Sequence, residues 1–145
     1  MEWIKENRRI SCDKKELDLD VIHSYLTRSY WCAGVSREIV ERSIDNSLCF
    51  GLFEDHKQIG FARMISDYST FGYLSDVFIL EEHQGKGLGK WLMACIKEHP
   101  DLQNMRRLLL ATRDAHGLYS QYGYKPLAKP EMFMEILTPI KAPKN

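Results

Sequence analysis

The sequence predicts an α/β fold in which helices flank a central mixed sheet, antiparallel at first and parallel in the middle. A strand, a turn and a second strand over residues 48–65 predict an antiparallel hairpin. An apolar strand over residues 73–80, a helix over 87–98 and a strand over 107–112 then form a crossover unit, which joins parallel strands. The 145 residues contain no linker or repeat and fit one domain, residues 1–145, with a core of its own.

The first third of the chain is predicted to hold one short strand and two helices. The strand covers about residues 8–12, and the first helix covers about residues 18–28, where apolar residues recur at helical spacing. Ser36 can cap a second helix that ends near Asn46. The pattern therefore places two helices before the hairpin.

The hairpin and the helix that follows it have the clearest patterns. Residues 48–54 and 58–65 are predicted strands, joined by a turn at residues 55–57. In the helix over 87–98, apolar residues recur at i, i+3, i+4, i+7 and i+8, which is the stripe of an amphipathic helix. These residues are Leu88, Trp91, Leu92, Cys95 and Ile96. Pro100 ends the helix.

The last quarter of the chain is predicted to close the sheet. A short helix over about residues 117–122 ends at Gly123, and closing strands are expected from Tyr124 onward and over residues 132–137. The apolar run Met132-Phe133-Met134 fits either a closing strand or an interface, so a homodimer stays open. Residues 141–145 are expected to fray.

Composition excludes several kinds of partner. Lys and Arg number 20, as do Asp and Glu, so the formal net charge is zero and gives no argument for nucleic-acid binding. No apolar run approaches the ~20 residues that cross a bilayer, and the charged start lacks the apolar stretch of a signal peptide. We therefore expect a cytoplasmic protein with neither a nucleic-acid nor a membrane partner.

The four cysteines do not have the spacing of a metal site. No C-x-x-C pair occurs, and no histidine stands near a cysteine at ligand spacing, so we expect no metal. Cys49 and Cys95 lie in apolar patterns, where a reduced cysteine usually acts as a small hydrophobic residue.

The segment between the buried strand and the amphipathic helix can bind an anion. Gly85, Gly87 and Gly89 occupy three of five positions there, so a ligand can approach the backbone and the free N–H groups of the helix. A dinucleotide fingerprint is excluded, because Lys90 stands where its third glycine belongs. A Walker loop is excluded too, because only three residues separate Gly85 from Gly89 and a tryptophan follows Lys90.

Two blocks resemble the GNAT superfamily of N-acetyltransferases. Gln84-x-x-Gly87-x-Gly89 is similar to the acetyl-CoA loop of that family, Q/R-x-x-G-x-G/A, which also lies between a buried strand and a long helix. Residues 112–124 resemble the later family block N-A-x-x-L-Y-x-x-x-G-F, with Asp114 in place of asparagine and Tyr124 in place of phenylalanine. The order of the elements also matches, so the resemblance implies a GNAT-like acyl-CoA N-acyltransferase fold.

The resemblance implies acetyl-CoA as cosubstrate and a set of residues that bind it. The strand at Val77, Phe78 and Ile79 would splay from strand 107–112 and offer its main chain to the pantetheine and the acetyl carbonyl. The loop would hold the pyrophosphate. The implied cofactor-binding residues are Val77, Phe78, Ile79, Gln84, Gly85, Lys86, Gly87, Leu88, Gly89, Lys90 and Asp114.

Acetyl transfer to an amine needs a general acid and a route for a proton. Tyr119 matches the family tyrosine that protonates the leaving thiolate, although it could instead merely pack the short helix. An alkyl ammonium with a pKa of ~10.4 is almost fully charged at pH 7, so a base must take a proton. Tyr73 stands where one family branch has its glutamate, so the candidates are Asp76 on the same strand or a water chain that ends at a carbonyl.

The acceptor is expected to enter between the N-terminal helices and the hairpin. Tyr25, Tyr30 and Trp31 lie close together in sequence there and can either line a pocket or pack the core. The leading hypothesis is an N-acetyltransferase that acts on a primary amine of a small molecule or a peptide. The alternative is a non-catalytic acyl-CoA sensor, and a purely structural domain ranks last because it leaves the glycine loop unexplained.

Overall fold

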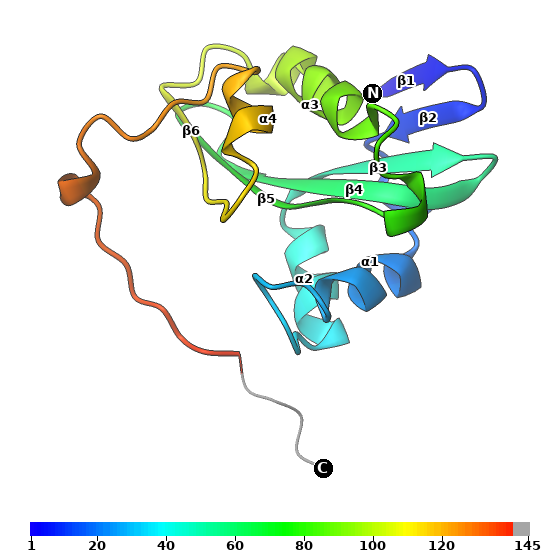
Figure 1. The fold of residues 1–145 in the computed structure, drawn as a ribbon, viewed down its shortest axis with the longest axis horizontal. Coiled ribbons are helices and arrows are strands. Elements are labelled where there is room, and N and C mark those ends of the chain that lie inside the picture. Colours follow the sequence, from blue (N-terminus) through cyan, green and yellow to red (C-terminus); the bar gives the residue numbers. More distant parts are fainter. Residues whose placement is uncertain (141–145) are drawn as a thin grey trace.

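The computed structural model describes residues 1–140 and has a central six-stranded sheet in which the strands follow chain order. Neighbours from β1 to β5 are antiparallel, and β5 and β6 are parallel. The strands are β1 (Glu2–Lys5), β2 (Arg8–Ser11), β3 (Leu48–Glu54), β4 (Lys57–Ser66), β5 (Phe71–Ile79) and β6 (Arg107–Leu110). Helices α1 (Leu19–Leu26) and α2 (Arg37–Asp45) lie on one face, and α3 (Leu88–Glu98) lies on the other (Figure 1). The short helix α4 (His116–Ser120) lies beside α3. The predicted α/β class is confirmed.

Local sequence explains the predicted hairpin. β3 and β4 are joined by Asp55 and His56, which have positive φ angles of 47° and 73°. A two-residue turn with both central residues in this region matches the twist of the strands it joins. The predicted strand 48–54 is confirmed at both ends, and β4 extends one residue beyond each end of the prediction.

Side-chain caps set the starts of α1 and α2. The Asp18 carboxylate accepts hydrogen bonds from the N–H groups of Asp20 and Val21, and the Ser36 hydroxyl accepts one from Ile39. Both helices were predicted, although α1 ends two residues early. Strand β1 was not predicted, because its four residues carry only a weak alternating pattern before the turn at Glu6.

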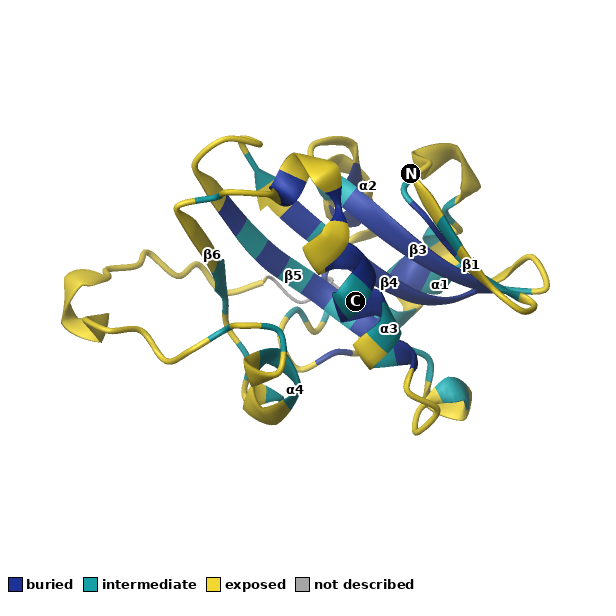
Figure 2. Ribbon diagram, turned by 90° about the horizontal axis from the view of Figure 1, so that it is seen from above, coloured by how far each residue is buried: buried dark blue, intermediate teal, exposed yellow. Residues whose placement is uncertain are grey.

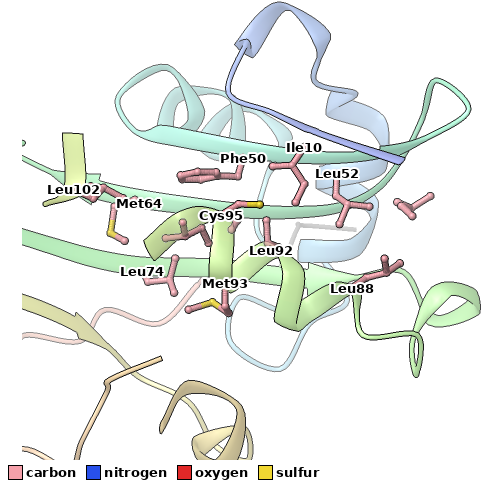
Figure 3. Packing of buried hydrophobic residues seen from close by; sticks show 13 residues of the cluster. Ile10, Phe50, Leu52, Met64, Leu74, Leu88, Leu92, Met93, Cys95 and Leu102 are labelled. Carbon is pink, nitrogen blue, oxygen red and sulfur yellow. The ribbon is translucent and has the colours of Figure 1, made fainter. Parts of the chain in front are cut away.

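Two hydrophobic clusters, one on each face of the sheet, form the core. The apolar stripe of α3 packs on the face that carries Ile10, Phe50 and Met64 (Figure 3). On the other face, α1 and α2 pack against Phe61 and Phe78. Cys49 and Cys95 are buried and burial raises the pKa of each thiol to about 12, so both cysteines are inert packing residues, as predicted.

The predicted closing strands are wrong. Within residues 124–140 the structure has one 3₁₀ turn, Pro130–Met132, and no strand, and this segment runs away from the sheet (Figure 1). The parallel pair therefore lies at the edge of the sheet and not in its middle, and β6 ends two residues before the predicted boundary. Alternating apolar residues form a strand only when they pair with a neighbouring strand, and within the described chain this segment pairs with none. The fraying prediction for residues 141–145 lies outside the described residues.

Candidate active site

A β-bulge in β5 separates this strand from β6. Phe61 pairs with Phe78 and Arg63 pairs with Ser75, so two residues of β5, Asp76 and Val77, lie opposite one residue of β4. Asp76 has a φ of 56°, which is uncommon for a residue with a side chain. β6 pairs with β5 only before the bulge, from Phe71 to Leu74, and the strand then continues to Ile79. The edge of β5 beyond Leu74 therefore has no strand partner within residues 1–140.

A cavity of about 420 Å³ lies where β5 and β6 part. It brings together six of the predicted site residues. They are Tyr30, Trp31, Asp76, Val77, Asp114 and Tyr119. The chain from Leu110 to Ala115 forms the opposite wall. Residues from four segments of the chain therefore meet at one site: 30–31, 73–77, 110–115 and Tyr119.

The structure does not bring Tyr25 into this cavity. Its ring stacks on Phe78 at 4.1 Å between ring centroids, and the Arg28 guanidinium lies over it at 4.6 Å. Burial raises the pKa of the Tyr25 hydroxyl. Tyr25 therefore packs against the core on the face that α1 and α2 cover. The sequence left two roles open for Tyr25, lining a pocket or packing the core, and the structure shows the second.

Asp76 is held by three side chains. Its Oδ2 accepts a hydrogen bond from Arg63 Nε at 2.8 Å, and its Oδ1 accepts one from Trp31 Nε1 at 2.9 Å and a longer one from Ser75 Oγ at 3.4 Å. The Arg63 and Asp76 side chains are only 13% and 8% exposed, so their ion pair is buried. Both carboxylate oxygens therefore have donors, and the pair fixes the bulge and the Trp31 ring in one arrangement.

Tyr30 closes the cavity from the connection between α1 and α2. Its hydroxyl accepts a hydrogen bond from the Arg113 N–H at 3.0 Å, and the Arg113 guanidinium lies 3.9 Å from the centre of its ring. The Tyr30 ring also meets Trp31 edge to face, at 5.1 Å between centroids. These contacts tie the connection between α1 and α2 to the segment that follows β6.

Sequence reasoning missed Arg63 and Arg113. Arg63 is the only charged residue between Gln58 and Ile65, so an isolated charge in a buried strand was the available signal. Such a charge usually requires a partner of opposite sign, which Asp76 supplies. Arg113 directly follows a predicted strand. Its partner Tyr30 lies 83 positions earlier in the chain, and no local sequence pattern connects the two residues.

Tyr119 lies on α4 and faces the cavity. Burial, with smaller effects from Tyr30 and Asp114, raises the pKa of its hydroxyl to about 12. Its ring meets that of Tyr124 edge to face at 6.1 Å. The phenol therefore stays protonated at neutral pH and can donate a proton, but cannot act as a base there.

The glycine loop presents free backbone donors at the start of α3. Gly85 and Gly87 have φ angles of 79° and 77°, and an added Cβ at either would meet nothing within 4 Å. Gly87 is the N-cap and provides no side-chain cap, unlike Asp18 in α1 and Ser36 in α2. The first N–H groups of α3, with the exposed Lys86 and Lys90 side chains, can therefore bind an anion from outside.

Neighbouring contacts join this loop to the rest of the site. Gln84 Nε2 donates to the Ile79 carbonyl at 2.9 Å, which fastens the loop to the end of β5. The Tyr122 hydroxyl donates to the Lys90 carbonyl at 2.8 Å, and Leu118 packs over Gly89. The helix that carries Tyr119 is therefore docked on the N-terminus of α3.

Residues 1–140 contain no group of three or more His, Cys, Asp or Glu side chains placed to hold a metal ion. None of the helices in this range combines the length and the hydropathy that a membrane span requires.

Comparison with known proteins identifies the family. Residues 45–126 match the model of the acetyltransferase (GNAT) domain, and this range includes both the glycine loop and α4. A relative from Gibberella zeae, named "putative acetyltransferase", is 31% identical over 140 residues, covering 82% of this chain and 79% of its own. The chain therefore belongs to the GNAT family of acetyltransferases.

Solved structures agree with the fold. A GNAT-family protein from Xanthomonas campestris pv. campestris, described as a putative acetyltransferase, is 49% identical with a TM-score of 0.89, over 91% of this chain and 94% of the other. A GNAT-family acetyltransferase from Elizabethkingia anophelis, with acetyl-CoA bound, is 15% identical with a TM-score of 0.64, over 83% and 78% of the two chains. The first is a close relative, and the second shares the fold.

Proposed function

We propose that this acetyltransferase transfers the acetyl group of acetyl-CoA to a primary amine of a small molecule or a peptide, by direct attack of the amine on the thioester. One observation carries the proposal. The N-terminus of α3, which has no side-chain cap, and the cavity between β5 and β6 both lie beside α4, the helix that bears Tyr119. The acetyl-CoA bound to the Elizabethkingia protein supports the same cosubstrate here.

The cosubstrate would lie between β5 and β6. Its pyrophosphate would accept hydrogen bonds from the N–H groups of the loop from Gln84 to Lys90, next to two lysine charges. Its pantetheine would pair with the free edge of β5 at residues 77–79, as an added strand does. Asp114 lies exposed on the opposite wall, where it replaces the family's asparagine.

The reaction would take place at the bulge. A main-chain N–H of β5 beyond Leu74, with no strand partner, would donate to the thioester oxygen as negative charge develops there. The C–N bond forms, the C–S bond breaks, and Tyr119 gives its proton to the departing thiolate; the proton that the acylated nitrogen loses then returns to the Tyr119 phenolate, which restores the phenol. Burial raises the pKa of the Tyr119 phenol to about 12, above the ~8.5 of a thiol in water, so transfer to a fully solvated thiolate would be unfavourable. The same burial also raises the proton affinity of the thiolate, which offsets part of this difference.

The acceptor amine would approach the aromatic wall of the cavity. Tyr30 and Trp31 can hold a cation over their rings, and a volume of about 420 Å³ suits a small amine or one side chain of a peptide. The ammonium must lose a proton before attack, either to Asp76 or through water to a main-chain carbonyl. Both Asp76 carboxylate oxygens already accept hydrogen bonds, from Arg63 and from Trp31, so the carboxylate faces the amine with its lone pairs engaged, which favours the second route.

Calorimetric titration with acetyl-CoA tests the cosubstrate before the acceptor is known. We expect binding of acetyl-CoA in the micromolar range, with NAD and ATP binding far more weakly. Release of free thiol with members of an amine panel then tests the reaction. No heat and no change in melting temperature with acetyl-CoA would contradict the proposal.

A non-catalytic acyl-CoA sensor is the second candidate. Two points favour it: Asp76, the buried carboxylate at the cavity, is already paired with Arg63, and Tyr73 takes the position where a family branch has glutamate. This candidate predicts tight binding of acetyl-CoA and no thiol release across the whole amine panel.

A further inference from the structure

A row of contacts along one wall of the cavity links Arg113 to the β-bulge. The Arg113 guanidinium lies 3.9 Å from the centre of the Tyr30 ring, and that ring meets Trp31 at 5.1 Å between centroids. Trp31 Nε1 then donates to Asp76 Oδ1 at 2.9 Å. All four residues line the cavity where β5 and β6 part. A positive charge therefore lies at one end of this wall, and the bulge, where the thioester would react, lies at the other.

The charges at the cavity do not favour an acceptor that carries only an ammonium group. The charged residues that line the cavity are Asp76, Arg113 and Asp114. Asp76 is paired with the buried Arg63 and also accepts a hydrogen bond from Trp31, so its charge is already compensated. Asp114 is an exposed carboxylate beside Arg113. Neither aspartate therefore offers an acceptor cation a buried charge without a partner.

The Arg113 side chain is held in place but keeps donors for a ligand. It lies in the connection between β6 and α4, which is mostly exposed (Figure 2). Its main-chain N–H donates to the Tyr30 hydroxyl at 3.0 Å, and its guanidinium lies over the same ring. Within residues 1–140 the guanidinium makes one hydrogen bond, a long one of 3.4 Å to Asp114. A guanidinium has several N–H donors in a planar fork, so most of them are available to a carboxylate.

We propose that the acceptor is a small amino acid whose amine and carboxylate are separated by several carbon atoms, and that Arg113 binds the carboxylate. The guanidinium would donate two hydrogen bonds to the carboxylate, and the carbon chain would lie along Tyr30 and Trp31. The amine would then reach the bulge. Because two aromatic rings stand between Arg113 and the bulge, an amine on the carbon next to the carboxylate is too close to it to span the wall. This inference rests on the proposed function and names the class of its acceptor.

Thiol release at neutral pH with ε-aminocaproate and with its neutral amide tests the class of acceptor. The two compounds have the same chain and the same amine and differ only in the charge at the far end. We expect kcat/KM to be at least about tenfold higher for ε-aminocaproate, because only this compound can form the charge-assisted pair. Glycine, whose amine lies next to its carboxylate, should react more slowly than ε-aminocaproate.

The outcomes separate this inference from the proposed function. Equal kcat/KM values for ε-aminocaproate and its amide, or faster turnover of glycine, would overturn the inference alone, because thiol release still supports the transferase. No thiol release with any member of a wider amine panel would overturn the proposed function and this inference with it.

Arg113→Gln tests the residue that carries the selectivity. We expect the ratio of kcat/KM for the two compounds to fall to about one, with the change in the KM for ε-aminocaproate. The Arg113 side chain is 65% exposed, so circular dichroism of the variant should match the wild type. Arg106→Gln, which removes an exposed arginine outside the cavity, is the matched control and should keep the ratio of the wild type. A preference for the carboxylate that survives in Arg113→Gln would overturn the role of Arg113.

A peptide that ends in lysine, with its N-terminus blocked, tests the other source of the same chemistry. It presents a side-chain amine and a carboxylate at a similar spacing, on a larger molecule. We expect slower turnover of this peptide than of ε-aminocaproate, because a cavity of about 420 Å³ suits a small molecule. Faster turnover of the peptide would overturn the assignment to a small amino acid.

Discussion

Burial gives Tyr119 a defined protonation state. The phenol lies between the cavity and the ring of Tyr124, and its pKa of about 12 keeps it protonated wherever the protein is folded near neutral pH. Tyr124 has the same raised pKa of about 12 but does not line the cavity. Of these two partly buried tyrosines, only Tyr119 lines the cavity where β5 and β6 part.

Tyr119→Phe should lower the acetylation rate at least about tenfold, because it removes the proton donor to the thiolate. Affinity for acetyl-CoA should stay the same, because the ring remains. Steady-state kinetics and calorimetry on the same preparation separate the two effects. Tyr124→Phe is the matched control and should keep full activity. Equal rates for the wild type and Tyr119→Phe would remove Tyr119 from the mechanism.

Asp76→Asn should destabilise the fold by roughly 3 kcal/mol, because it leaves the buried Arg63 guanidinium without a countercharge. Denaturant unfolding measures this loss. Asp114→Asn, which changes an exposed carboxylate, should change the free energy of unfolding by less than about 0.5 kcal/mol. A loss of turnover in Asp76→Asn with unchanged stability would instead identify Asp76 as a general base and not as a residue that positions the bulge.

At the scale of the elements, the start of α3 differs from the starts of α1 and α2. Asp18 and Ser36 satisfy the first N–H groups of their own helices, whereas the glycine cap of α3 has no side chain that could do so. In the proposed function the pyrophosphate takes this role. A carboxylate or hydroxyl at position 87 would stabilise the isolated helix and also compete with the pyrophosphate. The helix thus forgoes cap stabilisation, and an anion site remains open.

Gly87→Val should abolish measurable binding of acetyl-CoA while the chain still folds. The new side chain meets no protein atom within 4 Å of its Cβ, but it covers the N–H groups that would face the pyrophosphate. A branched residue at a φ of 77° also strains the backbone. Gly34→Val introduces the same strain at a φ of 83°, in the connection between α1 and α2, and serves as the control in calorimetry. Equal affinities in the two variants would contradict a role for the loop.

At the scale of the whole molecule, the sheet separates two hydrophobic clusters and carries the site at its far edge. The strands rich in core residues, β3 and β4, lie in the middle of the sheet, and β6 lies at the edge. An edge strand is free to part from its neighbour, which is why the cavity forms beside β5 and β6 and not within the packed centre.

The free energy of unfolding should fall as the pH rises from about 10 toward 12. Tyr119 and Tyr124 have a folded pKa of about 12, whereas an unfolded tyrosine titrates near 10. The folded chain therefore holds two protons that the unfolded chain loses in this range, so stability is full below about pH 10 and is lost above it. Denaturant unfolding at several pH values measures the slope. Combining Tyr119→Phe with Tyr124→Phe should flatten it, and an unchanged slope would show that neither tyrosine is the cause.

The sequence alone determined most of the local structure. The cap at Ser36, the turn at residues 55–57 and the amphipathic stripe of α3 depend on residues near one another in the chain, so their patterns are readable. The glycine loop was likewise found from its spacing. Its open donors were predictable because a helix start without a side-chain cap is a local feature.

Only the tertiary structure decided which residues share the site and where the sheet ends. The bulge at Asp76, its pairing with Arg63 and the contact of Tyr30 with Arg113 join segments 13 to 83 positions apart, which no periodicity records. Residues 132–137 have the pattern of a strand, yet they form none within the described chain. A strand depends on an available partner edge, whereas a helix satisfies its hydrogen bonds within itself, so helices are predictable from local sequence and edge strands are not.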